Sequence, residues 1–254
     1  HIYVNDSERL AIDEVADAEG RYDVATSKVV AAGFSKLYGF IEDLRVRKAR
    51  RLLSDMLNDV RAPLTFRKLR TPLGEASSAS NVKVRLYMHK ELATIIEETA
   101  EDLYIPGNHL YRMCVCRGLV EYGVIKGRYR DELIEVTKKF ISGVARFSGV
   151  VWSTLVNVYE YYGDELSDEM RKEFEELLTD EFPELAGSGK YDRWQLKKVD
   201  KVLKARSVEL AKKLKVSHSE YVNKSIRAMA MMLTQRFIAE MAIRELDEVV
   251  KDDA

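Results

Sequence analysis

The feature that most constrains the fold is a change of hydrophobic period within residues 82–123, from alternation in twos to a repeat of about 3.6 residues. Apolar side chains first alternate with basic or hydrogen-bonding ones: Val82, Val84, Leu86 and Met88 against Lys83, Arg85 and Tyr87. Because successive side chains of a strand point to opposite faces, this pattern predicts a short strand with a basic outer face. Helical periodicity then follows on both sides of a Pro-Gly-Asn breaker at 106–108. The segment therefore predicts one strand followed by two helices.

A unit of this size cannot bury its own core, so it requires a second copy. The sequence offers one at an offset of 111 residues, which aligns Leu92 with Leu203, Ala100 with Ala211, Leu103 with Leu214, Leu110 with Tyr221 and Val115 with Ile226. The strand of this second copy is degenerate, because Val199 lies one position away from where the alternating pattern would place an apolar residue. The two copies could pair within one chain, or each could pair with its twin in a second chain. Alternatively, the second region is a helical pair preceded by an exposed segment.

The strand, the helix pair and the turn spelling Val-Ser-His-Ser-Glu-Tyr-Val at 216–222 resemble the ribbon-helix-helix family of DNA-binding transcription regulators. This resemblance implies a mainly α fold, with ribbon-helix-helix modules and additional helices, in which paired strands enter the major groove. It implies base contacts by Lys83, Arg85, Tyr87, Arg193, Gln195 and Lys197. It implies phosphate contacts at the start of each second helix, by Gly107, Asn108, His109, Ser217, His218 and Ser219. The two-module architecture also resembles, more loosely, that of a transcription regulator of a filamentous archaeal virus.

Side chains that could cap the second helices are present in both turns. Asn108 is the expected N-cap of the first, and Ser217 or Ser219 that of the second, since Asn and Ser are favoured there. The turn of the first copy departs from the usual family spelling, and this departure weakens its phosphate assignment rather than its fold.

Charge is segregated along the chain, although the formal net charge is −1. Residues 44–70 carry nine basic and two acidic side chains, and residues 189–236 carry thirteen basic and four acidic ones. Residues 157–184 instead carry two basic and eleven acidic side chains. Such segregation fits a protein that faces a polyanion with some of its surfaces, or else a set of solvated helix faces. The run at 44–51 is expected late in a helix that begins near Thr26, and Arg47, Arg50 and Arg51 are further candidates for phosphate contact. A loosely structured basic arm would follow.

The rest of the chain is expected to be helical. Glycines, including Gly143, Gly149 and Gly163, divide residues 125–183 into three expected helices, and a long helix is expected from Ser219 nearly to Val250. Five regions follow: an N-terminal helical region with a basic arm and linker (1–81), the first module (82–123), an acidic helical connection (124–188), the degenerate second module (189–236), and a C-terminal helical extension with an acidic tail (237–254).

No catalytic, cofactor or metal site is expected. The sequence has no glycine-rich phosphate loop, no Ser-His-Asp set at a telling spacing, and no paired histidines with a carboxylate or thiol. Cys114 and Cys116 are predicted to be core thiols, because a spacing of two puts them on different sides of a helix. No apolar run approaches the roughly 18 residues of a membrane span, so a cytoplasmic location is expected, in the host cell if the protein is viral. Only two glutamines accompany abundant Glu, Lys and Arg, which indicates a heat-adapted source.

The patterns predict a protein without enzymatic activity, and the resemblance implies that it binds double-stranded DNA sequence-specifically and represses transcription, as a homo-oligomer or an intramolecular pseudo-dimer. One alternative is a DNA-organising or partition protein of the same fold. Another is a helical protein-interaction scaffold whose basic regions are simply solvated.

Overall fold

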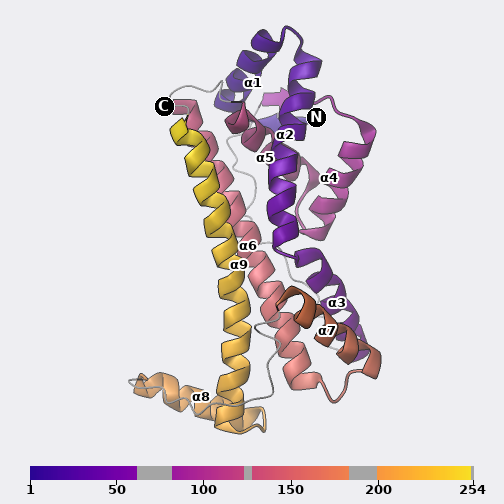
Figure 1. Ribbon diagram of the computed structural model, residues 1–254, viewed down its shortest axis with the longest axis vertical. Helices are drawn as coiled ribbons and strands as arrows, with labels where there is room; N and C mark the ends of the chain where they lie inside the picture. The colour runs from indigo at the N-terminus through magenta and orange to yellow at the C-terminus, as the bar shows by residue number, and fades with distance from the viewer. Residues whose placement is uncertain (62–81, 123–127, 183–198, 253–254) are drawn as a thin grey trace. The chain divides into compact units, whose positions relative to one another are not determined.

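The computed structural model describes residues 1–61, 82–122, 128–182 and 199–252 (Figure 1). Within these ranges the chain forms nine helices and one two-stranded sheet, so the expected mainly helical fold class is confirmed. Two compact units are present: His1–Arg47 with Arg70–Ser148 and Gln235–Ala254, and Lys48–Leu69 with Gly149–Thr234. Each unit combines stretches far apart in the sequence, whereas the five expected regions are continuous, and the boundaries of those regions stay predictions.

The sheet belongs to the first unit and joins two short antiparallel strands, β1 (Ile2–Val4) and β2 (Val82–Val84). Tyr3 stands opposite Lys83, and the flanking pairs are Ile2 with Val84 and Val4 with Val82. The sequence pattern predicted β2, but its partner was expected at residues 193–197 or in a second chain. The partner is β1, which the sequence analysis missed; residues 193–197 lie outside the described residues.

Each strand leads into a pair of helices (Figure 1). After β1 come α1 (Asp6–Glu19) and α2 (Tyr22–Asp43), and after β2 come α4 (Lys90–Asp102) and α5 (Gly107–Glu121). The start of α1 is a capping box, in which Asn5 and Glu8 each accept a hydrogen bond from the other's backbone N–H. Gly20, with φ +71°, ends α1 in the left-handed conformation that glycine adopts without strain.

Helices α2 and α5 form the closest crossing of the first unit, because glycine lies at the contact on both sides. A Cβ added to Gly33 would lie 1.8 Å from the carbonyl oxygen of Cys114. A Cβ added to Gly118 would lie 1.9 Å from the carbonyl oxygen of Val29. Cys114 precedes Gly118 by four residues and Val29 precedes Gly33 by four, so the two contacts are reciprocal. The contacts at this crossing are therefore related by a local two-fold symmetry.

A buried ion pair ties α1 to α5 within the same core. The Arg112 guanidinium donates to the Glu8 carboxylate from Nη2 at 2.7 Å and from Nε at 3.0 Å. Burial by itself lowers the pKa of Arg112, but the hydrogen bonds and the negative charge of Glu8 more than offset this and raise it. The thiol of Cys116 lies 3.6 Å from the same carboxylate. Both cysteines are free and buried, as expected, and burial raises the pKa of each thiol.

Two long helices, α6 (Arg128–Tyr162) and α9 (His218–Asp252), each contribute one part to the first unit. There the Ser148 hydroxyl lies 2.8 Å from Gln235 Oε1, and Lys138 pairs with Asp247 at 2.7 Å. The long C-terminal helix expected from Ser219 is confirmed. The expectation of three helices across 125–183 is wrong, because Gly143 and Gly149 both lie inside α6.

The second unit contains α7 (Asp168–Glu181), α8 (Lys201–Lys213), most of α3 (Val46–Asp59) and the remaining parts of α6 and α9. Trp152 packs edge-to-face on Phe182, with ring centroids 4.9 Å apart. The backbone N–H of Ser167 donates to Asp59 at 2.7 Å, which ties the approach to α7 to the end of α3. Gly149 of α6 lies beside α9, and a Cβ added to it would meet the Cα of Met232 at an ordinary contact distance of 3.4 Å.

The expected helix from Thr26 through the arginine-rich run is also wrong. The chain leaves the helical path at Leu44 and Arg45, where Arg45 has φ +53°, and α3 begins at Val46. Leu44 is fully buried at this break. The arginine-rich run is thus helical, as expected, but mostly in a separate helix, and the expected loose arm after it lies almost entirely at residues 62–81, outside the described residues.

Candidate nucleic-acid interface

The outer face of the β1–β2 sheet and the segment that follows β2 expose polar and basic side chains. Tyr3 and Lys83 are exposed on the sheet itself, and Arg85 and Tyr87 are exposed beyond its end at Val84; the side chains of Tyr3 and Tyr87 are 52% and 41% exposed. The strand is therefore shorter than the alternation over residues 82–88 predicted. The opposite face carries Ile2, Val4 and Val84, which are at most 1% exposed. The alternation inferred from the sequence is thus present in the structure. It is imposed by burial, because only one face of a two-stranded sheet can pack on the helices behind it.

Neighbouring groups hold the candidate readers in place without covering them. Arg85 Nε donates a long hydrogen bond of 3.4 Å to Nε2 of His1, and this contact is exposed. The backbone N–H of Tyr87 donates to Oγ1 of Thr26 at 3.4 Å, where Thr26 is buried in α2. The main chain at Tyr87 is therefore anchored to α2, while its side chain stays at the surface.

The start of α5 places a helix amino end in the same unit. Pro106 is its N-cap, with no side-chain hydrogen bond, so the expected capping role of Asn108 is wrong. Asn108 is the second residue of α5, two positions after the N-cap, and it is exposed. Gly107 is partly exposed. His109 is partly buried, with its ring centroid 6.0 Å from that of Phe140. Burial, assisted by the charge of Arg112, lowers the pKa of His109, so its imidazole is neutral at pH 7 and brings no positive charge to a phosphate.

The corresponding start of α2 differs in charge. Its N-cap, Arg21, makes no side-chain cap hydrogen bond, and the first turn carries Asp23. Arg21 pairs with Asp23 at 2.7 Å, and this hydrogen bond lowers the pKa of the Asp23 carboxyl. A negative side chain at this end disfavours an anion, so of the two helix starts that of α5 is better suited to a phosphate.

The candidate residues of the second copy lie in the second unit or outside the described residues. Ser217 Oγ accepts the backbone N–H of Glu220 at 3.1 Å, so Ser217 is the N-cap of α9, which confirms one of the two expected choices. His218 lies 2.8 Å from the hydroxyl of Ser207, and Ser219 is exposed. The remaining candidates of this copy, Arg193, Gln195 and Lys197, lie outside the described residues.

The three arginines of the basic run have different surroundings. Arg47 is engaged inside the first unit, where Nε pairs with Asp102 at 2.7 Å and Nη2 donates to Thr99 at 2.7 Å. Its guanidinium also lies over the ring of Tyr38. A phosphate contact by Arg47 would have to replace these interactions. Arg50 is partly buried and Arg51 is exposed, both on α3 in the second unit.

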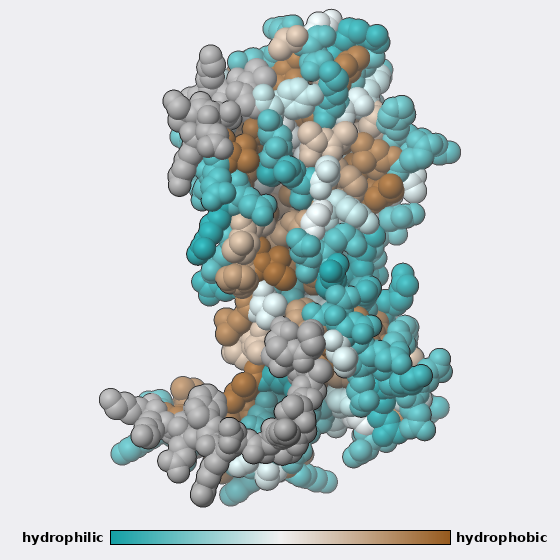
Figure 2. Space-filling view, viewed as in Figure 1, coloured by the Kyte–Doolittle hydropathy of each residue, from teal (hydrophilic) through white to brown (hydrophobic). Residues whose placement is uncertain are grey.

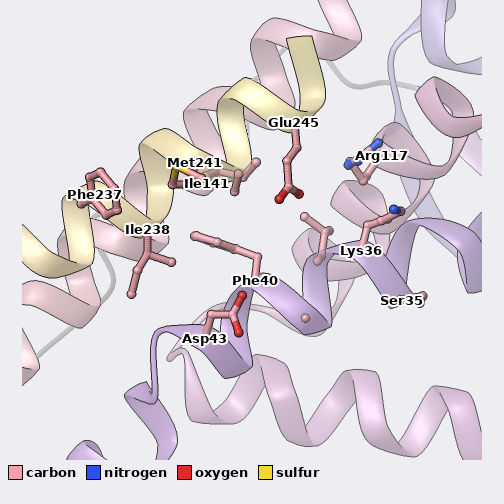
Figure 3. A pocket seen from close by; sticks show the side chains of 13 residues that line it. Ser35, Lys36, Phe40, Asp43, Arg117, Ile141, Phe237, Ile238, Met241 and Glu245 are labelled. Carbon is pink, nitrogen blue, oxygen red and sulfur yellow. The ribbon is translucent and has the colours of Figure 1, made fainter. Parts of the chain in front are cut away.

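A groove of about 440 Å³ lies between α2 and α9 in the first unit (Figure 3). Phe40, Ile141, Phe237 and Met241 form its apolar wall. Its charged side chains are of both signs: Lys36, Arg117, Asp43 and Glu245. Arg117 is itself paired with Glu121. This mixture does not suit a polyanion, so the outer face of the sheet is the stronger candidate for a nucleic-acid site.

Sequence reasoning missed the β1 half of this face, namely Tyr3 and His1. A strand of three residues is too short for alternation to be recognised, but two other signals were present. The Asn-x-x-Glu spelling at 5–8 marks a helix start, and Gly33 and Gly118 hold equivalent positions in α2 and α5, the second helix after each strand.

Comparison with protein-family models, with curated proteins and with solved structures finds no match to this chain. Among the described residues, no cluster of three or more His, Cys, Asp or Glu side chains is placed to hold a metal ion. None of the helices within the described ranges is both long and apolar enough to cross a membrane.

Proposed function

We propose that this protein binds double-stranded DNA through the outer face of the β1–β2 sheet and regulates transcription as a repressor. In this proposal the first unit is a ribbon-helix-helix module whose two halves, β1–α1–α2 and β2–α4–α5, come from one chain. The observation that carries it is the division of the sheet into a buried apolar face and an exposed face with Tyr3 and Lys83, which Arg85 and Tyr87 continue beyond the end of β2. The glycine-mediated crossing of α2 and α5 supports the pairing of the halves.

A two-stranded ribbon fits the roughly 12 Å wide major groove, where each base pair presents its own pattern of donors and acceptors. Arg85 is the principal reader in this proposal, because a guanidinium can donate two hydrogen bonds to guanine O6 and N7. One such bidentate contact contributes about 1 to 3 kcal/mol of discrimination between bases. Lys83 and Tyr87 are placed on the same exposed face and would contact neighbouring positions.

Phosphate contacts orient the ribbon, and the start of α5 at Gly107 and Asn108 is the proposed anchor. Its first-turn N–H groups and the positive end of the helix dipole attract an anion. The overall charge of −1 offers no general attraction to DNA, so the affinity must come from local groups such as these.

The two strands present different side chains, so the DNA segment read by one ribbon should not itself be palindromic. Tyr3 lies on β1 directly opposite Lys83 on β2, and Arg85 has no arginine counterpart on β1. A ribbon formed by identical strands of two chains would instead read a two-fold symmetric segment.

Selection of bound duplexes from a random library, followed by footprinting and salt-titrated binding, tests this proposal. Arg85→Ala is expected to weaken binding to the selected site by about 10- to 100-fold while changing nonspecific binding little. Arg236→Ala is the matched control, since Arg236 is an exposed arginine on α9 that pairs with Glu240.

Equal losses of affinity for selected and unrelated duplexes in Arg85→Ala would contradict direct base reading. Failure to enrich any sequence would contradict sequence-specific binding altogether. A short discrete footprint is expected; cooperative spreading along long DNA would favour a DNA-organising role.

A further inference from the structure

The most exposed apolar surface of the second unit covers α8 and the beginning of α9. Val202 and Leu203 on α8 are 76% and 67% exposed, values unusual for large apolar side chains. Brown, apolar surface is visible over α8 and along α9 in Figure 2. The α8–α9 face is defined here by its exposed apolar members: Val199, Val202, Leu203, Leu214, Ile226, Met229, Met232 and Leu233.

The face has a covered counterpart in the first unit. At the offset of 111 residues, Leu103 and Val115 of the α4–α5 pair are 0% and 1% exposed, whereas Leu214 and Ile226 are 45% and 42% exposed. In the first unit α2 packs against α5, which carries Val115. In the second unit α6 packs on α9 near Met232, but Leu214 and Ile226 stay exposed. The equivalent positions are therefore covered in the first helical pair and uncovered in the second.

The size of the α8–α9 face matches a protein interface. From their exposed fractions, its eight side chains present on the order of 700 Å² to solvent, close to the ~800 Å² that each partner of a standard interface buries. A polyanion would gain nothing from these side chains, so a protein partner with an apolar surface is required.

The arrangement along α9 favours a second copy as that partner. Ile226, Met229 and Leu233 recur every three to four residues and so form one stripe, which a two-fold axis would bring against itself. On α9 the cations beside this stripe are paired within the chain, since Lys224 pairs with Glu220 at 3.0 Å and Arg227 pairs with Glu160. The α9 stripes of two copies could thus meet through paired charges.

We infer that the α8–α9 face is the interface of a homodimer, in which the α9 helices of two copies cross near Met229. This residue occupies the position of Gly118 in the first unit, so the two helices would be held further apart than α2 and α5 and packed through flexible methionine side chains. The inference does not depend on DNA binding, because it concerns the second unit alone.

Sedimentation equilibrium of the full chain, from about 1 to 100 μM, tests the inference. The wild-type protein is expected to sediment at twice the monomer mass of 29.2 kDa. Leu203→Glu and Leu233→Glu should each raise the dissociation constant at least about 100-fold, because a two-fold interface contains every substitution twice. Leu10→Glu is the matched control: Leu10 is 51% exposed on α1 in the first unit, and its replacement should leave the mass unchanged.

A wild-type chain that stays monomeric over this range would overturn the inference and would indicate that another part of the same chain covers the face. A dimer that all three variants retain would also overturn it, because association would then use a different surface. Both face variants replace exposed side chains, so circular dichroism should match that of the wild type and exclude unfolding as the cause of dissociation.

Discussion

The reciprocal glycine contact between α2 and α5 leads to the most quantitative prediction, the effect of Gly33→Ala. The new Cβ would lie 1.8 Å from the Cys114 carbonyl oxygen and 2.6 Å from the backbone nitrogen of Gly118. Ordinary contact begins near 3.4 Å, so the helices would have to separate by about 1.5 Å. Both clashing atoms belong to the main chain, and no change of rotamer can relieve them.

The expected cost follows from two opposing effects. Overpacking a well-packed core costs about 1 to 3 kcal/mol, and this site should lie at the upper end because backbone must move. Replacing a helical glycine with alanine returns about 1 kcal/mol through helix propensity. Gly33→Ala should therefore lower the free energy of unfolding of the first unit by about 2 kcal/mol. Gly118→Ala should cost a similar amount, and the double variant should cost less than both together, since one separation of the helices accommodates both methyl groups.

Gly39 provides a matched control on the same helix. A Cβ added there meets nothing within 4 Å, so Gly39→Ala should gain the propensity term alone and stabilise by up to about 1 kcal/mol. The opposite signs at Gly33 and Gly39 separate close packing from helix propensity.

Urea unfolding combined with hydrogen exchange of α2 and α5 peptides is the appropriate assay, because a chain with two units need not unfold in one step. Exchange protection in these peptides should fall in Gly33→Ala and hold or rise in Gly39→Ala. If the two variants agreed within about 0.5 kcal/mol, the tight crossing of α2 and α5 would be refuted.

Two further predictions concern the core of the first unit. Arg112→Met should lower the free energy of unfolding in urea by about 3 to 5 kcal/mol, because it leaves the Glu8 carboxylate buried without its guanidinium. Adding Glu8→Gln should recover part of that loss. A loss under about 1 kcal/mol in Arg112→Met would contradict the prediction. Alkaline pH should also destabilise this unit: burial raises the pKa of Cys114 and Cys116 above 9.0, so the folded chain keeps protons that the unfolded chain releases. The free energy of unfolding is therefore unaffected by these thiols below pH 9. It declines as the pH rises further, by up to about 1.4 kcal/mol per pH unit for each thiol. Unfolding at pH 8 and 10 should show a smaller decline when both residues are replaced by alanine, and an equal decline would refute this origin.

The types of the elements between residues 82 and 121 could be predicted because they depend on local pattern. Alternation at Lys83 and Arg85 places them on the exposed side of any sheet whose other side is buried, and Pro106 ends the helical path of α4 wherever the helices pack. The N-cap at Ser217 and the long α9 follow in the same way from neighbouring residues.

Errors arose where a local signal is ambiguous. Glycine inside an apolar stretch can end a helix or lie within one, and the sequence does not show that Gly143 and Gly149 lie within α6 whereas Gly163 follows its end. The break before α3 has no glycine or proline marker, since Arg45 itself adopts the positive φ while Leu44 is buried.

The sequence by itself determined that a basic, alternating strand precedes two amphipathic helices, and that such a unit requires a partner. The tertiary structure alone decided which partner it has: β1 and α2 complete the first unit, because the pairing of Ile2 with Val84 and the contact of Gly33 with Gly118 join residues about 80 positions apart. Pairing of this kind leaves no local periodicity to read, since a three-residue strand and one glycine per helix suffice for it. For the same reason only the structure distinguished the covered α4–α5 pair from the exposed α8–α9 face.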